Sequence, residues 1–78
     1  MIKVGQIYKQ KEKPDWRKDE AAIFSITFVG FYISIIDTDG VSSIVSRDWV
    51  EGDCELVAEY PTWQEAVNSK EFKDVAED

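Results

Sequence analysis

A chain of 78 residues is long enough for one small domain, and its 44% hydrophobic content is typical of globular proteins rather than disordered ones. The lack of histidine excludes Ser-His and Cys-His nucleophile pairs, and the net charge of −7 disfavours general binding to nucleic-acid backbones. A single cysteine cannot form an internal disulfide, and no apolar run approaches the ~20 residues that span a bilayer, so we expect a cytoplasmic protein.

The first predicted element is a strand over residues 2–9 (IKVGQIYK), whose alternation is interrupted by Gly5. A glycine inside a strand indicates a bulge or a close approach of another backbone segment. We therefore expect the inward side of the strand to change after Gly5, so that Ile7 faces the core.

A long charged loop follows, KEKPDWRKDE (residues 11–20), with Trp16 near its centre. Loops of this length are uncommon in compact domains and usually have a function. Trp16 either folds back onto the core or projects as an aromatic anchor for a partner, and the sequence leaves both arrangements open. Its cationic neighbours are Lys13, Arg17 and Lys18.

The strongest strand signal is AIFSITFVGFYISIID, residues 22–37. A two-residue turn at Val29-Gly30 would make it an antiparallel hairpin with one buried face. Because the β-branched Val29 resists a positive φ, a Gly30 bulge in one continuous strand is the alternative. The hairpin predicts that six side chains share the buried face: Phe24, Ile26, Phe28, Phe31, Ile33 and Ile35.

Three further elements are predicted before residue 61. Asp37-Thr38-Asp39-Gly40 fits a type I turn with its glycine in the left-handed conformation, and residues 41–46 return as a strand. Residues 47–53 (RDWVEGD) read as a connector, with Trp49 mainly expected in the core, and residues 54–60 as a last strand. On one side of that strand we expect Cys54, Leu56 and Ala58.

A helix is predicted over about residues 62–73. Pro61 ends the preceding strand, and Thr62 with Glu65 forms the pattern of a capping box. We expect the apolar stripe of this helix to cover an open edge of the sheet, and residues 74–78 to form a frayed tail. The stripe consists of Trp63, Ala66, Val67 and Phe72.

The order of these elements resembles the SH3-like small barrels: strand, long variable loop, three-strand meander, single helical turn, closing strand. The resemblance covers residues 2–60 and is topological, since the ALYDY-type stretch and paired tryptophans of peptide-binding SH3 domains are absent. It implies a mainly β (α+β) single domain over residues 1–78, a five-stranded antiparallel barrel followed by a short C-terminal helix. The acidic chain opening with KVGQIY (residues 3–8) is also similar to small accessory proteins of phages and prophages of Gram-positive bacteria.

No pattern in the chain indicates catalysis, so we expect no enzymatic activity, no cofactor and no metal site. The Asp37–Gly40 turn lacks the later ligands of an EF-hand loop, because Ser46 stands six residues after the glycine. The main hypothesis is a non-catalytic module that binds a protein partner through an aromatic and charged loop. The residues proposed to contact that partner are Trp16, Lys13, Arg17, Lys18 and Trp49.

The distribution of charge supports two alternatives. Residues 1–20 carry six basic and four acidic groups, whereas residues 21–78 carry three basic and twelve acidic ones. The first alternative is an acidic inhibitor or nucleic-acid mimic of phage type that blocks a basic groove on a host enzyme, and the second is weak nucleic-acid binding through the basic segment. Exposed aromatic residues would equally serve a homodimer. The acidic surface of the first alternative comprises Asp37, Asp39, Asp48, Glu51, Asp53 and Glu55.

Overall fold

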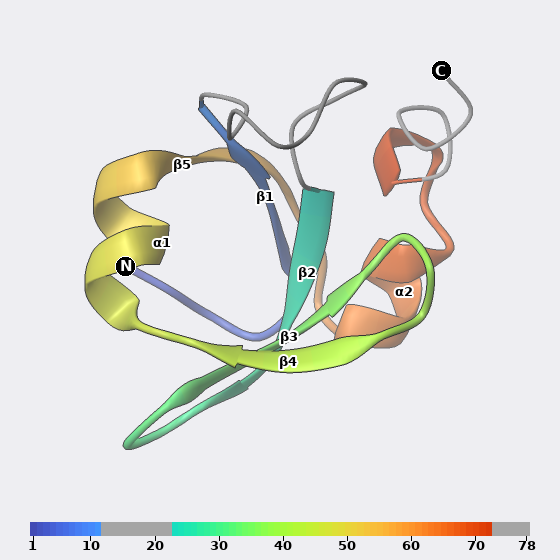
Figure 1. Ribbon diagram of the computed structural model, residues 1–78. Helices are drawn as coiled ribbons and strands as arrows, with labels where there is room; N and C mark the ends of the chain where they lie inside the picture. Colours follow the sequence, from blue (N-terminus) through green and yellow to red (C-terminus); the bar gives the residue numbers. More distant parts are fainter. Residues whose placement is uncertain (12–22, 73–78) are drawn as a thin grey trace.

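The computed structural model describes residues 1–11 and 23–72, which form a mainly β fold with two short helices (Figure 1). Five antiparallel strands make one unclosed sheet in the order β4-β3-β2-β1-β5, as the predicted mainly β class requires. The strands are β1 (Gln6–Gln10), β2 (Ile23–Val29), β3 (Ile33–Asp37), β4 (Ser42–Val45) and β5 (Cys54–Glu59). The helices are α1 (Arg47–Asp53), between β4 and β5, and α2 (Trp63–Val67), after β5.

Both faces of the sheet carry buried side chains. The inner face curls toward α1, and Figure 1 shows the sheet and α1 arranged as a ring with α2 outside it. The inner cluster contains Ile2, Tyr8, Phe24, Ile26, Ile33, Ile35, Val50 and Cys54. The outer cluster contains Ile7, Ile23, Ala66 and Phe72. Because neighbours along a strand point to opposite faces, β1 buries both Ile7 and Tyr8, which explains why its sequence lacks a polar side.

Gly5 joins the start of the chain to two strands. Its N–H donates to the Ile26 carbonyl and its carbonyl accepts from the Tyr60 N–H, both at 3.0 Å. It has a φ of +94°, and a Cβ on it would lie 2.2 Å from the Tyr60 carbonyl oxygen. The predicted close backbone approach is confirmed, although β1 begins at Gln6 and not at residue 2.

The predicted Val29-Gly30 turn is wrong. The loop between β2 and β3 consists of residues 30–32, and the Gly30 N–H donates to the Tyr32 carbonyl at 3.0 Å. Val29 is instead the last residue of β2, where it pairs with Ile33 and packs against the inner cluster. The three-residue loop avoids the positive φ that a two-residue turn favours, and no residue other than glycine has a positive φ in the described chain.

A bulge in β2 explains why the predicted buried face of the hairpin is also partly wrong. The register shifts between Ile26, which pairs with Ile35, and Phe28, which pairs with Ser34. The extra residue, Thr27, changes the side to which the following side chains point, so Phe28 lies on the outer face. Only four of the six predicted core residues are therefore buried, namely Phe24, Ile26, Ile33 and Ile35, whereas Phe28 and Phe31 are exposed.

The predicted turn between β3 and β4 is confirmed. The Asp37 carbonyl accepts from the Gly40 N–H at 3.0 Å, and Gly40 has a φ of +83°. The Asp37 carboxylate also accepts from the backbone N–H groups of Asp39 and Val41, both at 2.9 Å. These two bonds explain the preference for aspartate at the first position of such a turn.

The predicted connector of residues 47–53 is helix α1. The Ser46 hydroxyl caps its first turn by accepting from the Trp49 N–H at 3.1 Å. Asp48 in that turn is favourably placed beside the positive end of the helix. Val50 is completely buried in the inner cluster, so α1 covers the inner face of the sheet.

The predicted alternation of β5 fails after Leu56. Ile7 pairs with Ala58 and Tyr8 with Leu56, so Val57 is the extra residue of a second bulge. Cys54 belongs to the inner cluster, Ala58 packs against the outer one, and Leu56 is 50% exposed. The three residues therefore do not share one buried side.

Helix α2 starts where its cap predicts and ends early, at Val67 rather than near residue 73. The Glu65 N–H donates to the Thr62 hydroxyl at 3.2 Å, while the Glu65 carboxylate accepts from that hydroxyl rather than from the Thr62 backbone. After a break at Asn68 and Ser69, residues 70–72 are helical again, and the Ser69 hydroxyl caps this stretch by accepting from the N–H of the buried Phe72. The helix packs on the face formed by β1 and β2, so the predicted position over a sheet edge is wrong.

Candidate interaction surface

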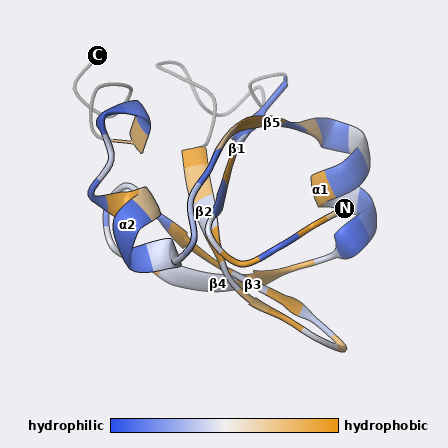
Figure 2. Cartoon of the chain, turned by 180° about the vertical axis from the view of Figure 1, so that it is seen from behind, coloured by the Kyte–Doolittle hydropathy of each residue, from blue (hydrophilic) through white to orange (hydrophobic). Residues whose placement is uncertain are grey.

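The hairpin end formed by β2, β3 and the loop between them projects from the body of the molecule (Figure 1), and three aromatic residues lie there, one on β2 and two in the loop. We call Phe28, Phe31 and Tyr32 the aromatic tip. Phe28 is 46% exposed, Tyr32 is 49% exposed and Phe31 is fully exposed. Figure 2 shows hydrophobic residues along this hairpin, whereas α1 and α2 are mainly hydrophilic. A cluster of exposed aromatic rings of this kind is typical of a protein contact surface.

Two of these rings already pack against each other in the absence of a partner. The rings of Phe28 and Tyr32 lie 5.1 Å apart, centroid to centroid, with their planes tilted by 33°. Gly30 makes room for this pair, because a Cβ there would lie 2.7 Å from the Phe28 ring. A partner that docks on these two paired rings would lose little side-chain entropy in ordering them.

The outer face continues from the aromatic tip across the sheet. Phe28 pairs with Ser34, and Ser34 pairs with Ile44 of β4, so the three side chains form one row. Ile44 is 68% exposed. No charged residue occurs in residues 21–36 or 40–46, although the whole chain carries a net charge of −7. The uncharged surface is therefore bordered by acidic turns and helices.

The site residues predicted from the sequence lie elsewhere. Trp16 and its cationic neighbours Lys13, Arg17 and Lys18 are outside the described residues. Trp49 lies on α1, half-buried against the inner cluster, as expected for a residue that plugs the core. The alternating pattern does not predict the aromatic tip, because it places Phe28 and Phe31 on the buried face. The resistance of Val29 to a tight turn was the available signal that the loop would move toward Phe31.

The six acidic residues of the inhibitor hypothesis divide into separate groups. Asp37 and Asp39 occupy the turn between β3 and β4. The other four follow β4, on α1 and at the start of β5: Asp48, Glu51, Asp53 and Glu55. Figure 1 places the turn and α1 at opposite ends of β4. The arrangement gives two acidic regions with an uncharged strand between them.

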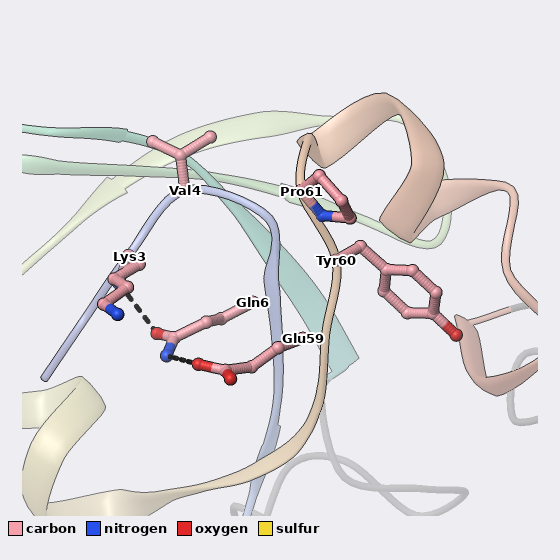
Figure 3. Close-up of a pocket in the computed structure, with 6 residues that line it drawn as sticks. All are labelled: Lys3, Val4, Gln6, Glu59, Tyr60 and Pro61. Carbon is pink, nitrogen blue, oxygen red and sulfur yellow. Dashed lines mark hydrogen bonds between the residues drawn. The ribbon is translucent and has the colours of Figure 1, made fainter.

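A shallow pocket of about 260 Å³ lies beside the Gln6 side chain (Figure 3). The buried Gln6 amide donates to the Met1 carbonyl at 3.1 Å and to the Glu59 carboxylate at 2.6 Å. Its oxygen accepts from the Lys3 N–H at 2.7 Å and from the Tyr8 hydroxyl at 2.9 Å. The residues lining the pocket are Lys3, Val4, Gln6, Glu59, Tyr60 and Pro61. Because these contacts satisfy both ends of the amide, the network holds the chain start on β1 and β5 and leaves Gln6 no group for a ligand.

The reactive groups of the described chain have structural roles. Burial, followed by the charge of Asp53, raises the pKa of the Cys54 thiol to about 11, so the thiol stays protonated near neutral pH. Burial, followed by the charge of Glu59, also raises the pKa of Tyr8. Within residues 1–11 and 23–72, no three metal-binding side chains of the His, Cys, Asp or Glu type come together. Over the same residues, no helix has the length and hydropathy needed to cross a bilayer.

Comparison with protein-family models, with curated proteins and with solved structures finds no match for this chain. The residues and their geometry are therefore the only basis for a functional conclusion.

Proposed function

We propose that this chain is a non-catalytic protein-interaction module that binds a protein partner through the aromatic tip. The observation that carries the proposal is the complete exposure of Phe31 beside the tilted ring pair of Phe28 and Tyr32. A domain of this size needs aromatic area in its core for stability. The fully exposed Phe31 and the exposed halves of Phe28 and Tyr32 would gain further apolar contacts only when a partner covers them.

The chemistry of the tip defines the partner surface that would fit it. Phe31 requires an apolar pocket, and the Phe28–Tyr32 pair requires a flat apolar rim with an acceptor or donor for the Tyr32 hydroxyl. The acidic groups around the uncharged hairpin favour a partner with basic residues at the border of that pocket. Such charges would mainly raise the association rate at low salt.

We include in this proposal an SH3-like small barrel as the finer description of the fold. The strand order β4-β3-β2-β1-β5, the long segment between β1 and β2, and the short helix between β4 and β5 all support it. The contact surface would differ from that of peptide-binding SH3 domains, whose aromatic motif this sequence lacks. The resemblance of KVGQIY adds a proposed setting, that of a cytoplasmic accessory protein of a phage or prophage.

The division of the acidic residues favours the aromatic tip over the inhibitor hypothesis. A mimic of a nucleic-acid backbone presents an extended run of negative charge, whereas here the uncharged β4 separates the acidic turn from α1. Weak nucleic-acid binding would rest on the basic segment of residues 1–20, because Arg47 is the only basic residue between positions 21 and 69.

The experiment is quantitative affinity capture from the source cells with wild-type protein, Phe31→Ser and Leu56→Ser. Leu56 is the matched control, since it is an apolar residue that is 50% exposed on a different strand. We expect Phe31→Ser to weaken binding of the captured protein by about 30-fold or more, the size of an interface hot spot. Leu56→Ser should bind as wild type does. Equal capture by all three proteins would overturn the proposal.

A further inference from the structure

β4 is a short edge strand of four residues that carries no charge or proline to oppose pairing with another strand. Within residues 1–11 and 23–72, β3 is the only strand that pairs with it, and three of its four residues are exposed. Residues 40–46 (GVSSIVS) include no charge and no proline, the features by which natural edge strands avoid other strands. The opposite edge, β5, is protected in this way by the exposed Glu55 and Glu59.

The register shows which backbone groups of β4 point outward. The Asp37 N–H donates to the Val41 carbonyl, so residues 37 and 41 form a hydrogen-bonded pair. Hydrogen-bonded and non-hydrogen-bonded pairs alternate along an antiparallel ladder. The backbone groups of Ser43 and Val45 are therefore turned toward β3, while those of Ser42 and Ile44 point away from the sheet. They offer two N–H donors and two carbonyl acceptors to an added strand.

The sequence around β4 is complementary to itself. A two-fold axis through Ser43 places Ser42 opposite Ile44 of a second copy, which matches the outward backbone groups on both strands. Asp39 lies four residues before Ser43 and Arg47 lies four residues after it. The same axis brings the turn that carries Asp39 beside the start of α1 of the other copy, where Arg47 is the basic residue and Asp48 an acidic one. Asp39 and Arg47 are both exposed.

We propose that a second copy of this chain binds along β4, by antiparallel pairing about a two-fold axis at Ser43. Two ion pairs between Asp39 and Arg47 of opposite copies fix the register. Each copy adds its five-stranded sheet to that of the other. The interface is small, which corresponds to a weak dimer with a dissociation constant in the range of about 10–100 μM.

The dimer goes beyond the proposed function and uses a different surface. Residues 30–32 follow the end of β2 and lie beside the Ile33–Val45 pair, at one end of β4. Antiparallel pairing puts the two aromatic tips at opposite ends of the shared edge. The assembly therefore presents two tips to a partner with repeated sites, which increases avidity without any new contact.

Charge exchange tests the register. Asp39→Arg alone and Arg47→Asp alone should each weaken dimerisation by about tenfold, measured by sedimentation velocity, and the double variant should restore it. Glu55→Arg is the control, because it changes the net charge by the same amount as Asp39→Arg but on the β5 edge. Since it lowers the repulsion between two acidic chains, it should not weaken the dimer.

Cysteine cross-linking tests the axis directly. Ser43 faces its own counterpart in a non-hydrogen-bonded pair, where Cα atoms lie about 4.5 Å apart and a disulfide can form. Ser43→Cys should therefore cross-link under mild oxidation much faster than the control Val41→Cys. The native Cys54 is buried and does not compete.

Three results would overturn the dimer: a monomer at about 1 mM protein, no restoration in the double charge variant, or equal cross-linking at positions 41 and 43. Phe31→Ser should dimerise as wild type does. If the chain is a monomer but Phe31→Ser still loses the captured partner, only the dimer is refuted. If the chain is a dimer but Phe31→Ser captures the partner as wild type does, only the proposed function is refuted.

Discussion

The indole of Trp49 stacks on the ring of Phe24, with ring centroids 5.3 Å apart and planes inclined by 22°. This contact joins α1 to β2 across the inner cluster, between two segments far apart in the sequence. Trp49, one of the three tryptophans, therefore has a structural role.

Replacing Trp49 with alanine should lower the free energy of unfolding by about 3 kcal/mol, because the substitution leaves a cavity beside Phe24. Glu51→Ala, an exposed position on the same helix, should change it by less than about 0.5 kcal/mol. Urea titration followed by far-UV circular dichroism measures both. Should Trp49→Ala keep wild-type stability but lose a partner, Trp49 would be a binding residue instead.

Thr62→Ala should destabilise the chain by about 1 kcal/mol, because the Glu65 N–H loses the hydroxyl that caps α2. Thr62→Ser keeps the acceptor oxygen and should retain most of the stability. Thermal unfolding of the two variants against wild type checks the difference. Equal melting temperatures would show that the cap does not hold α2 on the sheet.

Two glycines with positive φ allow backbone strain to be separated from steric contact. Gly40→Ala should cost about 1 kcal/mol, because the added Cβ has open space and only the left-handed conformation is penalised. Gly5→Ala should cost at least about 2 kcal/mol more, since its Cβ would also meet the Tyr60 carbonyl oxygen at 2.2 Å. Denaturant unfolding compares them. Similar losses would argue against the tight approach of the chain start to β5.

Alkaline pH should destabilise the fold through Cys54. Its pKa is raised from 9.0 to about 11, mainly by burial, so the protonated thiol is favoured in the folded state. The resulting stabilisation is complete below pH 9 and is lost as the pH rises toward 11. Burial raises the pKa of Tyr8, and a hydrogen bond to the Glu71 carboxylate raises the pKa of Tyr60, so both contribute with the same sign.

Cys54→Ala should therefore show a smaller decrease in unfolding free energy between pH 9 and 11 than the wild-type chain does. Urea titrations across this range measure the decrease. Iodoacetamide at pH 8 should also label the native thiol far more slowly than the unfolded one. Rapid labelling of the native chain would show that Cys54 is accessible and ionised.

The sequence predicted well the elements that depend on local signals. Asp37 and Gly40 define their turn through contacts within four residues, and Thr62 marks the start of α2 in the same way. The residues of helix α1 do not predict it, because they are only seven and include Gly52, and only the resemblance to SH3-like barrels implies a helical turn there. Its packing on the sheet, a tertiary contact, stabilises it.

The register of the strands could not be predicted in the same way. The bulges at Thr27 and Val57 change which side chains face the core, and neither has a local sequence signature. The aromatic tip was missed for this reason, since Phe28 follows a bulge and Phe31 lies in the loop. An alternating apolar pattern shows that a hairpin exists but does not show where its alternation breaks.

The most direct test of the proposed function places a photoreactive benzophenone amino acid at position 31 or, as a control, at position 56. Irradiation in the source cells, followed by mass spectrometry, identifies what each position contacts. We predict a discrete adduct with a different protein from position 31 and none from position 56. No adduct at position 31, or the same set of adducts at both positions, would contradict a role for the aromatic tip in binding.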